Sequence, residues 1–366
     1  MLAVLAVLLP LLLGRGELAV GPGRSQAGAA PGWWDGAGPQ RARRARIMLA
    51  YGSGGAPEWS AARLRYYLAH VRPDGRPDDW FFDTVLFLAL ASGQWRSLCP
   101  GFGDAPPRAQ DWRWYLEERL FGGIHEVGEL QQAARELGRE LGDPRHVVWV
   151  IIMIPYPDPR ATEFGALAEG ERALDLSQEA DRVEAVRWYL REVARRWSQG
   201  GYEHLRLGGF YWVHEEVPEG DRQLIRAVSA LAWQQMQPLY WIPYYGAHGN
   251  TAWRELGFDV AIQQPNYYFY DVPRDRLAEA AAIGRRYRMG MELELDRRVL
   301  ESAERRARYA SYLDAGWEYG FQEAGWLAWY DDTALMECAR AADPEVRRIY
   351  DDTYLFAKGR YRPRGG

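Results

Sequence analysis

The sequence predicts a (β/α)8 barrel, because eight apolar strand-like runs alternate along it with amphipathic helical stretches. Near-continuous apolar strands that alternate with helices are typical of a parallel sheet covered on both faces. Eight such units predict closure into a barrel with right-handed crossovers, and a length of 366 residues suits one barrel domain with insertions. The alternative is an open doubly wound sheet with a phosphate-binding turn, but residues 51–55 lack GxGxxG and a Walker lysine.

The elements can be placed in order from this alternation. Strands are expected at Ile47–Tyr51, Trp80–Leu90, Val147–Ile154, Gly208–Val213, Leu239–Tyr244, Asp259–Gln264, Gly290–Leu295 and Gly320–Trp329. Helices are expected at Glu58–Val71, Asp111–Leu141 (two helices), Ser177–Ser198, Asp221–Gln237, Thr251–Leu256 (short), Asp275–Arg288, Arg297–Ala315 and Asp332–Tyr350.

The N-terminus differs in composition from the rest of the chain. Met1–Leu13 is an apolar run of signal-peptide length, too short to span a bilayer as a helix, and small residues follow at 27–30. We therefore expect a signal peptide over residues 1–30, a disordered linker over 31–46 and the barrel over 47–366. This predicts a secreted or cell-surface protein without a membrane span in the mature chain. The basic n-region is missing, so the alternative is a cytoplasmic protein with a misassigned start codon.

Composition excludes several partners and cofactors. The net charge of -5 and the absence of a basic stripe argue against nucleic acid. The six histidines form no HxH or HExxH pattern, and Cys99 and Cys338 form no CxxC pair, so neither a metal site nor a cofactor is predicted and a disulfide is not favoured. The 17 Trp and 22 Tyr fit either core packing or stacking on sugar rings.

Carboxylates at the ends of the fourth and seventh strands are the main functional signal. Glu215 and Glu216 follow the fourth strand, and alternation along a strand lets only one of them face the pocket. Glu292 and Glu294 lie two apart in the seventh strand, so they share a face. Strand ends form the active-site rim of such a barrel, and two carboxylates across a rim are typical of glycoside hydrolases. A single glutamate at a strand end is more often part of a structural salt bridge; the pairing at the fourth and seventh strands is what favours catalysis.

Further polar and aromatic residues in or just after the predicted strands are candidates for binding a sugar. The candidate substrate-binding residues are Tyr51, Trp212, His214, Tyr244, His248, Gln264, Asn266, Tyr267 and Trp326. Asn266 follows Pro265, which fixes its amide in a turn. Taken singly, most of them also fit a satisfied turn or packing residue.

Several long motifs resemble a known bacterial family. They are the segments 81–83, 153–157, 209–212, 241–245, 264–267, 290–294 and 350–354, which read FFD, MIPYP, GFYW, WIPYY, QPNY, GMELE and YDDTY. Together they resemble the family catalogued as domain of unknown function 4855, whose name implies no established activity. A looser likeness is to clan A glycoside hydrolases, which implies an acid/base glutamate after the fourth strand and a nucleophile on the seventh. His214 stands where that clan has Asn before the glutamate.

These patterns favour an exported glycoside hydrolase that acts on a polysaccharide or glycoconjugate. Glu215 is the expected acid/base and Glu294 the expected nucleophile of a retaining mechanism, with Glu216 and Glu292 as alternates. A catalytically silent carbohydrate-binding barrel or scaffold component is the alternative from another class. A third reading is a metal-assisted hydrolase that uses His214, His248 and the glutamates.

Overall fold

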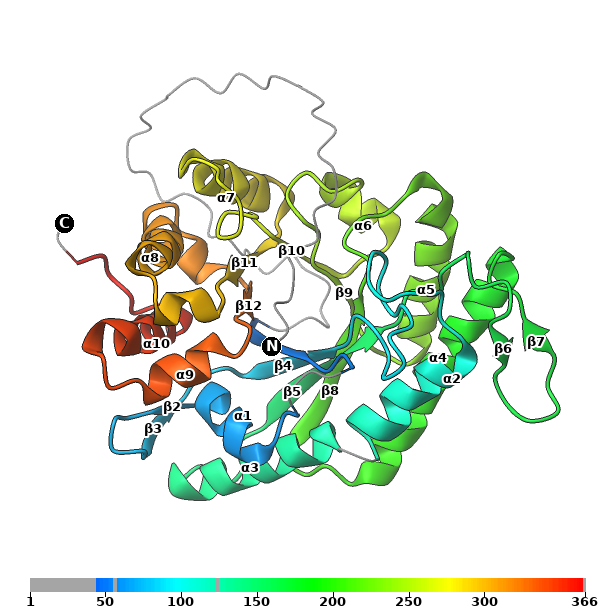
Figure 1. Cartoon of the computed structure of the whole chain (residues 1–366), viewed down its shortest axis with the longest axis horizontal. Helices are drawn as coiled ribbons and strands as arrows, with labels where there is room; N and C mark the ends of the chain where they lie inside the picture. Colours follow the sequence, from blue (N-terminus) through cyan, green and yellow to red (C-terminus); the bar gives the residue numbers. More distant parts are fainter. Residues whose placement is uncertain (1–43, 55–57, 123–124, 365–366) are drawn as a thin grey trace.

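A computed structural model describes residues 44–54, 58–122 and 125–364. Its eight main strands form a closed parallel barrel surrounded by helices, as Figure 1 shows, which confirms the predicted (β/α)8 fold. Around the barrel the strands are β1 (Ala45–Tyr51), β4 (Thr84–Leu88), β5 (Val148–Ile154), β8 (Leu205–Trp212), β9 (Leu239–Trp241), β10 (Val260–Gln263), β11 (Gly290–Glu294) and β12 (Trp326–Tyr330), which pairs with β1. The predicted signal peptide (1–30) and most of the predicted linker (31–46) lie outside the described residues; β1 begins within the last two linker positions.

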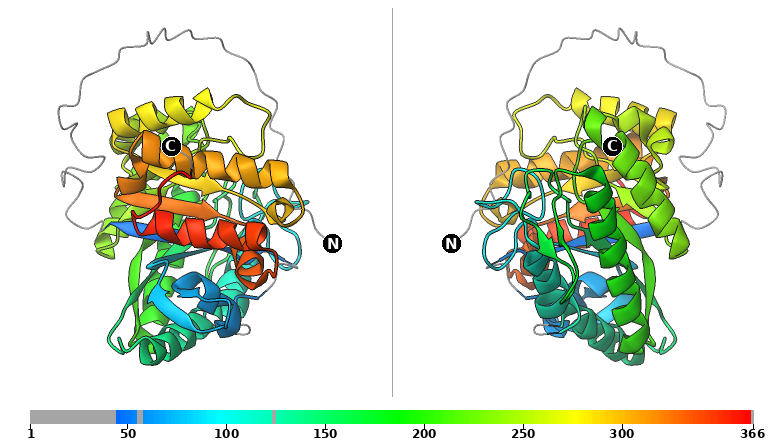
Figure 2. Two further views of the ribbon diagram at one scale, coloured as in Figure 1. Left: turned by 90° about the vertical axis from the view of Figure 1, so that its left-hand side faces the viewer. Right: turned by 90° about the vertical axis from the view of Figure 1, so that its right-hand side faces the viewer.

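The helices follow the strands in the order that the sequence predicts. They are α1 (Ala61–Leu68), α2 (Ala109–Trp114), α3 (Glu126–Glu140), α4 (Glu179–Gly200), α5 (Arg222–Gln234), α6 (Trp253–Leu256), α7 (Asp275–Tyr287), α8 (Ala303–Glu318), α9 (Ala334–Arg340) and α10 (Pro344–Ala357). Helix α2 continues as a π-helical segment, Tyr115–Leu120. Helices α8 and α10 contact each other and lie side by side along one side of the barrel (Figure 2).

Several predicted element boundaries were wrong. The first predicted helix, Glu58–Val71, is shorter, because α1 ends at Leu68 and Ala69–Val71 form a short strand. The second barrel strand begins at Thr84 rather than Trp80, because the amides of Phe81 and Phe82 bond to the end of α1. Residues Pro77–Trp80 instead form β3, an antiparallel partner of β2 (Ala69–Val71) outside the barrel.

Two further errors concern the last strand and the last helix. The eighth strand begins at Trp326 rather than Gly320, since Phe321–Glu323 form a 3-10 turn. The predicted helix Asp332–Tyr350 is divided into α9 and α10. Asp343 accepts a hydrogen bond from the Glu345 amide, and Pro344 starts α10.

Strand register identifies the side chains that fill the barrel. Glu292 and Ile47 both pair in register with Ala328, so all three point to the same side of the sheet. The neighbouring Trp329 points to the other side, where its indole Nε1 donates a hydrogen bond to Tyr309 in helix α8. Since α8 belongs to the outer layer, Glu292 faces the barrel interior.

A buried ion pair lies beside the segment that directly follows β1. Arg119 of the π-helical segment and Glu126 at the start of α3 are both buried and bond to each other. Glu126 also accepts a hydrogen bond from the Trp59 amide. A methyl group at Gly52, directly after Tyr51, would come within 3.2 Å of both charged side chains, so glycine lets this pair pack beside the rim. Burial raises the pKa of Glu126 to about 7, outweighing the effect of Arg119.

A second charged cluster fastens the β2–β3 hairpin to α10. His70 in β2 bonds through Nδ1 to Asp78 at 2.7 Å and through Nε2 to Asp351 of α10 at 2.9 Å. The imidazole also stacks on Tyr354, with ring centroids 4.2 Å apart. Burial lowers the pKa of His70, but the hydrogen bonds to the two carboxylates outweigh it and the pKa is raised.

Candidate active site

The site is built around two glutamates of β11. Glu292 and Glu294 lie on the interior face, and only 4 % and 3 % of their surfaces are exposed. Glu294 is the last residue of the strand, in register with Tyr330 at the end of β12. Glu294 therefore lies at the carboxyl-end rim, and Glu292 lies one pleat deeper.

Glu294 is held by three hydrogen-bond donors. The hydroxyl of Tyr312, from α8, bonds to Oε2, and the Tyr267 amide donates to the same oxygen at 3.1 Å. Nδ2 of Asn266 lies 3.3 Å from Oε1. Burial raises the pKa of Glu294, and these hydrogen bonds offset part of that rise because they favour the ionised form. No comparable set of donors surrounds the other carboxyl groups of the described site.

Asn266, one of the donors to Glu294, has an unusual backbone conformation. Its φ of 48° lies in the left-handed region, which asparagine tolerates better than most residues. Its Oδ1 accepts the Tyr245 amide at 2.6 Å, and its Nδ2 also contacts Gln264 Oε1 at 3.1 Å. The amide is therefore fixed from both ends while it points at Glu294.

Glu215 lies three residues beyond the end of β8, half-buried at the rim. The Gln264 side chain acts to lower the pKa of its carboxyl, and Gln264 Oε1 accepts a hydrogen bond from Asn266 Nδ2. A chain of side chains thus connects Glu215, Gln264, Asn266 and Glu294. Burial and the charge of Glu294 raise the pKa of Glu215 to about 7, against the opposing effect of the Gln264 hydrogen bond. Glu215 can therefore hold a proton in weakly acidic solution and release it near neutrality.

The Glu216 carboxyl group contacts a different set of side chains. The Tyr244 hydroxyl donates to Glu216 Oε2 at 2.7 Å, and His214 Nε2 lies 3.9 Å from Oε1. The Glu216 side chain is 30 % exposed, far more than either glutamate of β11. Burial lowers the pKa of His214. Glu215 and Glu216 lie beyond the end of β8, where strand alternation no longer applies, and Glu215 is the one whose pKa is raised by the charge of Glu294.

Aromatic side chains surround the carboxylates. Tyr51 ends β1, and its ring meets that of Tyr330 edge to face with centroids 5.3 Å apart. Phe269 meets Tyr330 in the same way at 5.6 Å. Burial raises the pKa of Tyr51 well above its usual value, and the charge of Glu292 adds to this. The half-exposed rings of Tyr51, Phe269 and Tyr330 offer apolar faces beside the carboxylates.

Two predicted binding residues lie away from the rim. Trp212 points to the helix side of β8, opposite to Tyr211, and meets the ring of Tyr156 at 5.8 Å. Trp326 is the first residue of β12, at the amino end of the barrel and therefore opposite the rim. Both indoles are buried packing residues, so the expectation that they contact substrate is corrected.

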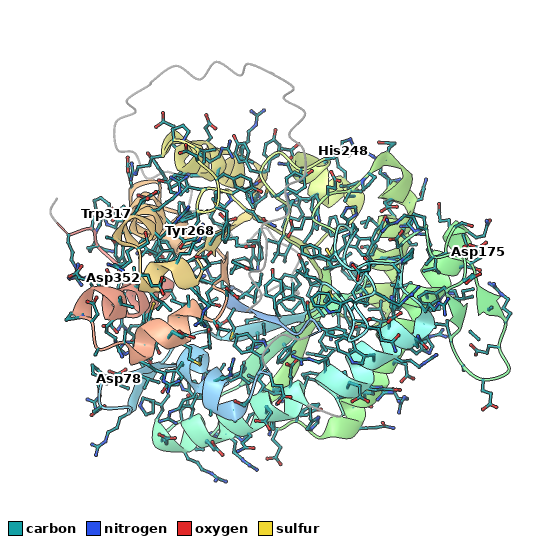
Figure 3. All side chains as sticks on the ribbon, viewed as in Figure 1. Asp78, Asp175, His248, Tyr268, Trp317 and Asp352 are labelled. Carbon is teal, nitrogen blue, oxygen red and sulfur yellow. The ribbon has the colours of Figure 1, made fainter. Side chains whose placement is uncertain are left out.

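The remaining predicted binding residues contact different partners. Gln264 and Asn266 bond to the carboxylates, as above, and Tyr244 and His214 contact Glu216. Tyr267 contributes its amide, while its ring packs under Arg308 at 4.0 Å. His248 is exposed near α6, where its Nδ1 is 2.7 Å from the Val217 carbonyl (Figure 3). Sequence reasoning missed Tyr312 and Tyr330; the latter was hidden by ending the eighth strand one residue early.

The described part of the chain holds neither a metal-binding cluster nor a disulfide bond. Among these residues no group of three or more His, Cys, Asp and Glu side chains is arranged to hold a metal ion. Cys99 and Cys338 are both free and buried. No helix in residues 44–54, 58–122 and 125–364 has the length and apolar character needed to cross a membrane.

Comparisons with known proteins identify one matching family. The family named domain of unknown function 4855 (DUF4855) matches residues 46–355. Curated proteins gave no match. Among solved structures, a protein proposed to be an alpha-L-fucosidase from Bacteroides thetaiotaomicron aligns with 12% identity and a TM-score of 0.48, covering 87% of this chain and 97% of that one. A mutant tryptophan synthase alpha-subunit from Pyrococcus furiosus aligns with 8% identity and a TM-score of 0.38, covering 87% and 100%.

Proposed function

We propose that this chain, which belongs to the DUF4855 family, is a retaining glycoside hydrolase that uses Glu215 and Glu294. Its substrate would be a polysaccharide or glycoconjugate, bound at the carboxyl-end rim of the barrel. No cofactor takes part in this reaction. The proposal rests on one observation above all: two glutamates from opposite parts of the barrel are joined through Gln264 and Asn266, in environments that suit different roles.

Glu215 would act as the acid/base. A group that gives a proton to the leaving oxygen must be protonated when substrate binds and must lose that proton readily. The pKa of about 7 meets this requirement, because it lies near the pH at which most enzymes work. In the second step the Glu215 carboxylate would take a proton from the water that attacks the glycosyl-enzyme.

Glu294 would act as the nucleophile. Its Oε2 accepts from Tyr312 and Tyr267, and its Oε1 accepts from Asn266, so it is the carboxyl best equipped to hold a negative charge. One carboxylate oxygen would form a bond to the anomeric carbon as the bond from that carbon to the leaving oxygen breaks. Proton transfer from Glu215 balances the charge on the leaving group.

We also propose that the protein is exported. The support is the apolar run Met1–Leu13 followed by small residues at 27–30. Expression of the full chain in a bacterial host, followed by N-terminal sequencing of the extracellular or surface fraction, tests this. The expected product begins near residue 31; an unprocessed chain confined to the cytoplasm would contradict export.

The catalytic proposal is tested by hydrolysis of a panel of polysaccharides and aryl glycosides. The wild type is expected to cleave at least one, and Glu294→Gln should lose most of this activity while keeping its fold and its affinity for the glycan. Glu169→Gln, which neutralises an exposed loop carboxylate, is the matched control and should behave as wild type. If nothing in a broad panel is cleaved but a glycan binds, the protein is a carbohydrate-binding barrel.

A further inference from the structure

Glu292 is a buried carboxyl that the two-glutamate reaction does not use. It lies two residues before Glu294 on the same face of β11, which places it about 7 Å deeper in the barrel. Its Oε2 is buried and has no hydrogen-bond partner. Leaving a buried polar atom unpaired costs roughly as much as a lost hydrogen bond, so a hydrophobic residue would be more stable at this position.

The groups that face Glu292 favour its protonated form. Glu294 from the same strand and Glu215 from beyond β8 add negative charge, and burial acts in the same direction. Among the described residues, Tyr51, Tyr211, Tyr312 and Tyr330 also interact electrostatically with it, from β1, β8, α8 and β12. Burial and these two carboxylates raise the pKa of Glu292 well above its ordinary value.

We propose that the Glu292 carboxyl forms the floor of the sugar site and recognises one hydroxyl of the bound sugar ring. This inference rests on the proposed function and adds a specificity-determining residue to it. A protonated carboxyl can donate one hydrogen bond and accept another, which matches a hydroxyl that also does both. The sugar would supply the missing partner of Oε2, so the cost of the unpaired atom is relieved only when substrate binds.

Two substitutions separate this role from that of a nucleophile. Glu292→Gln keeps the shape, one donor and one acceptor but cannot ionise, so kcat/KM should stay within about tenfold of wild type. Glu292→Leu keeps the bulk and removes the hydrogen bonds, so kcat/KM should fall by more than tenfold. If Glu292→Gln is as inactive as Glu294→Gln, an ionised Glu292 is required and the proposal is wrong.

Deoxy analogues of the cleaved substrate identify the hydroxyl. For the wild type, removal of one particular hydroxyl should lower kcat/KM by tenfold or more, and the same removal should cost Glu292→Leu little, because its partner is already gone. Equal losses in wild type and Glu292→Leu at every position would overturn the assignment. A wild type that cleaves nothing would instead refute the proposed function itself.

A measurement without substrate tests the protonation state separately. A proton that the folded state keeps and the unfolded state loses makes unfolding easier as the pH rises above the ordinary range of a glutamate. Between about pH 5 and pH 8.5, the melting temperature of the wild type should therefore fall more than that of Glu292→Gln. Glu169→Gln should follow the wild type. Parallel falls for wild type and Glu292→Gln would show that Glu292 is ionised when folded, contradicting the proposal.

Discussion

The Tyr312 hydroxyl offers the sharpest test of how Glu294 is held. Tyr312→Phe removes one oxygen from a fully buried ring and leaves the backbone of α8 unchanged. The hydroxyl donates to Oε2 of Glu294 and also accepts from the Tyr267 amide at 3.2 Å; after its removal, that amide still donates to the same Glu294 oxygen at 3.1 Å. The substitution therefore removes one hydrogen bond to the carboxylate with little change in packing.

The expected magnitude depends on the charge of Glu294. A hydrogen bond to an ionised group is worth about 1.5–3 kcal/mol, against about 0.5–1.5 kcal/mol for a neutral pair. Tyr312→Phe should therefore lower the free energy of unfolding by roughly 1 kcal/mol more in alkaline solution, where Glu294 is ionised, than in acid. If Glu294 is the nucleophile, losing this bond raises its pKa further, and the acidic limb of the kcat/KM profile moves to higher pH.

Urea unfolding at several pH values measures this difference, with Tyr309→Phe as the matched control. Tyr309 is also buried in α8, but its hydroxyl bonds to Thr353 and to the Trp329 indole, which carry no charge. The control should lose about 1 kcal/mol at every pH. If Tyr312→Phe likewise shows one constant loss from acid to alkali, its hydroxyl does not stabilise a carboxylate and the description of Glu294 is wrong.

Three further perturbations have defined outcomes. Glu215→Gln should remove the alkaline limb of the pH profile of kcat/KM, which in the wild type should lie near the pKa of about 7. The same substitution should slow the cleavage of aryl glycosides with good leaving groups least, and an unchanged alkaline limb would exclude Glu215 as the acid. Arg119→Met removes the partner of Glu126 and should lower the free energy of unfolding more in alkaline solution, where Glu126 is ionised in the wild type, than in acid, where it is protonated; a pH-independent loss in urea unfolding would contradict this. His70→Phe should lower the melting temperature most at pH values below the ordinary pKa of histidine, where the bound imidazole is charged. The loss should shrink as the pH rises through the raised pKa of His70, and a larger loss in alkaline solution would refute this.

The barrel could be predicted from the sequence because its signal is repeated eight times. Each buried strand of a parallel barrel reads as an apolar run, and each covering helix has one apolar face, so single errors do not change the fold. The errors came where backbone bonding overrides the pattern. The apolar run at Trp80–Phe82 reads as strand, but the amides of Phe81 and Phe82 cap the end of α1.

Only those site residues that lie on strands or directly after them could be predicted from the sequence. Alternation predicts that Glu292 and Glu294 share a face, because this rule is local. The reach of Tyr312 from α8 to Glu294 depends on how a helix of the outer layer docks, and no spacing in the sequence indicates it. Trp326 failed because an aromatic residue in a strand fits core packing as well as ligand binding: it is the first residue of β12, at the end of the strand opposite the rim.

Trapping of a glycosyl-enzyme tests the central proposal most directly. The wild type is incubated with 2-deoxy-2-fluoro glycosides of whichever sugar the panel identifies, and the protein is digested and analysed by mass spectrometry. A retaining enzyme that uses Glu294 should carry one glycosyl unit on the peptide that contains this residue, and Glu294→Gln should carry none. A label on a different carboxylate, or NMR of the first product showing an inverted anomeric configuration, would contradict the assignment of Glu294 as the nucleophile.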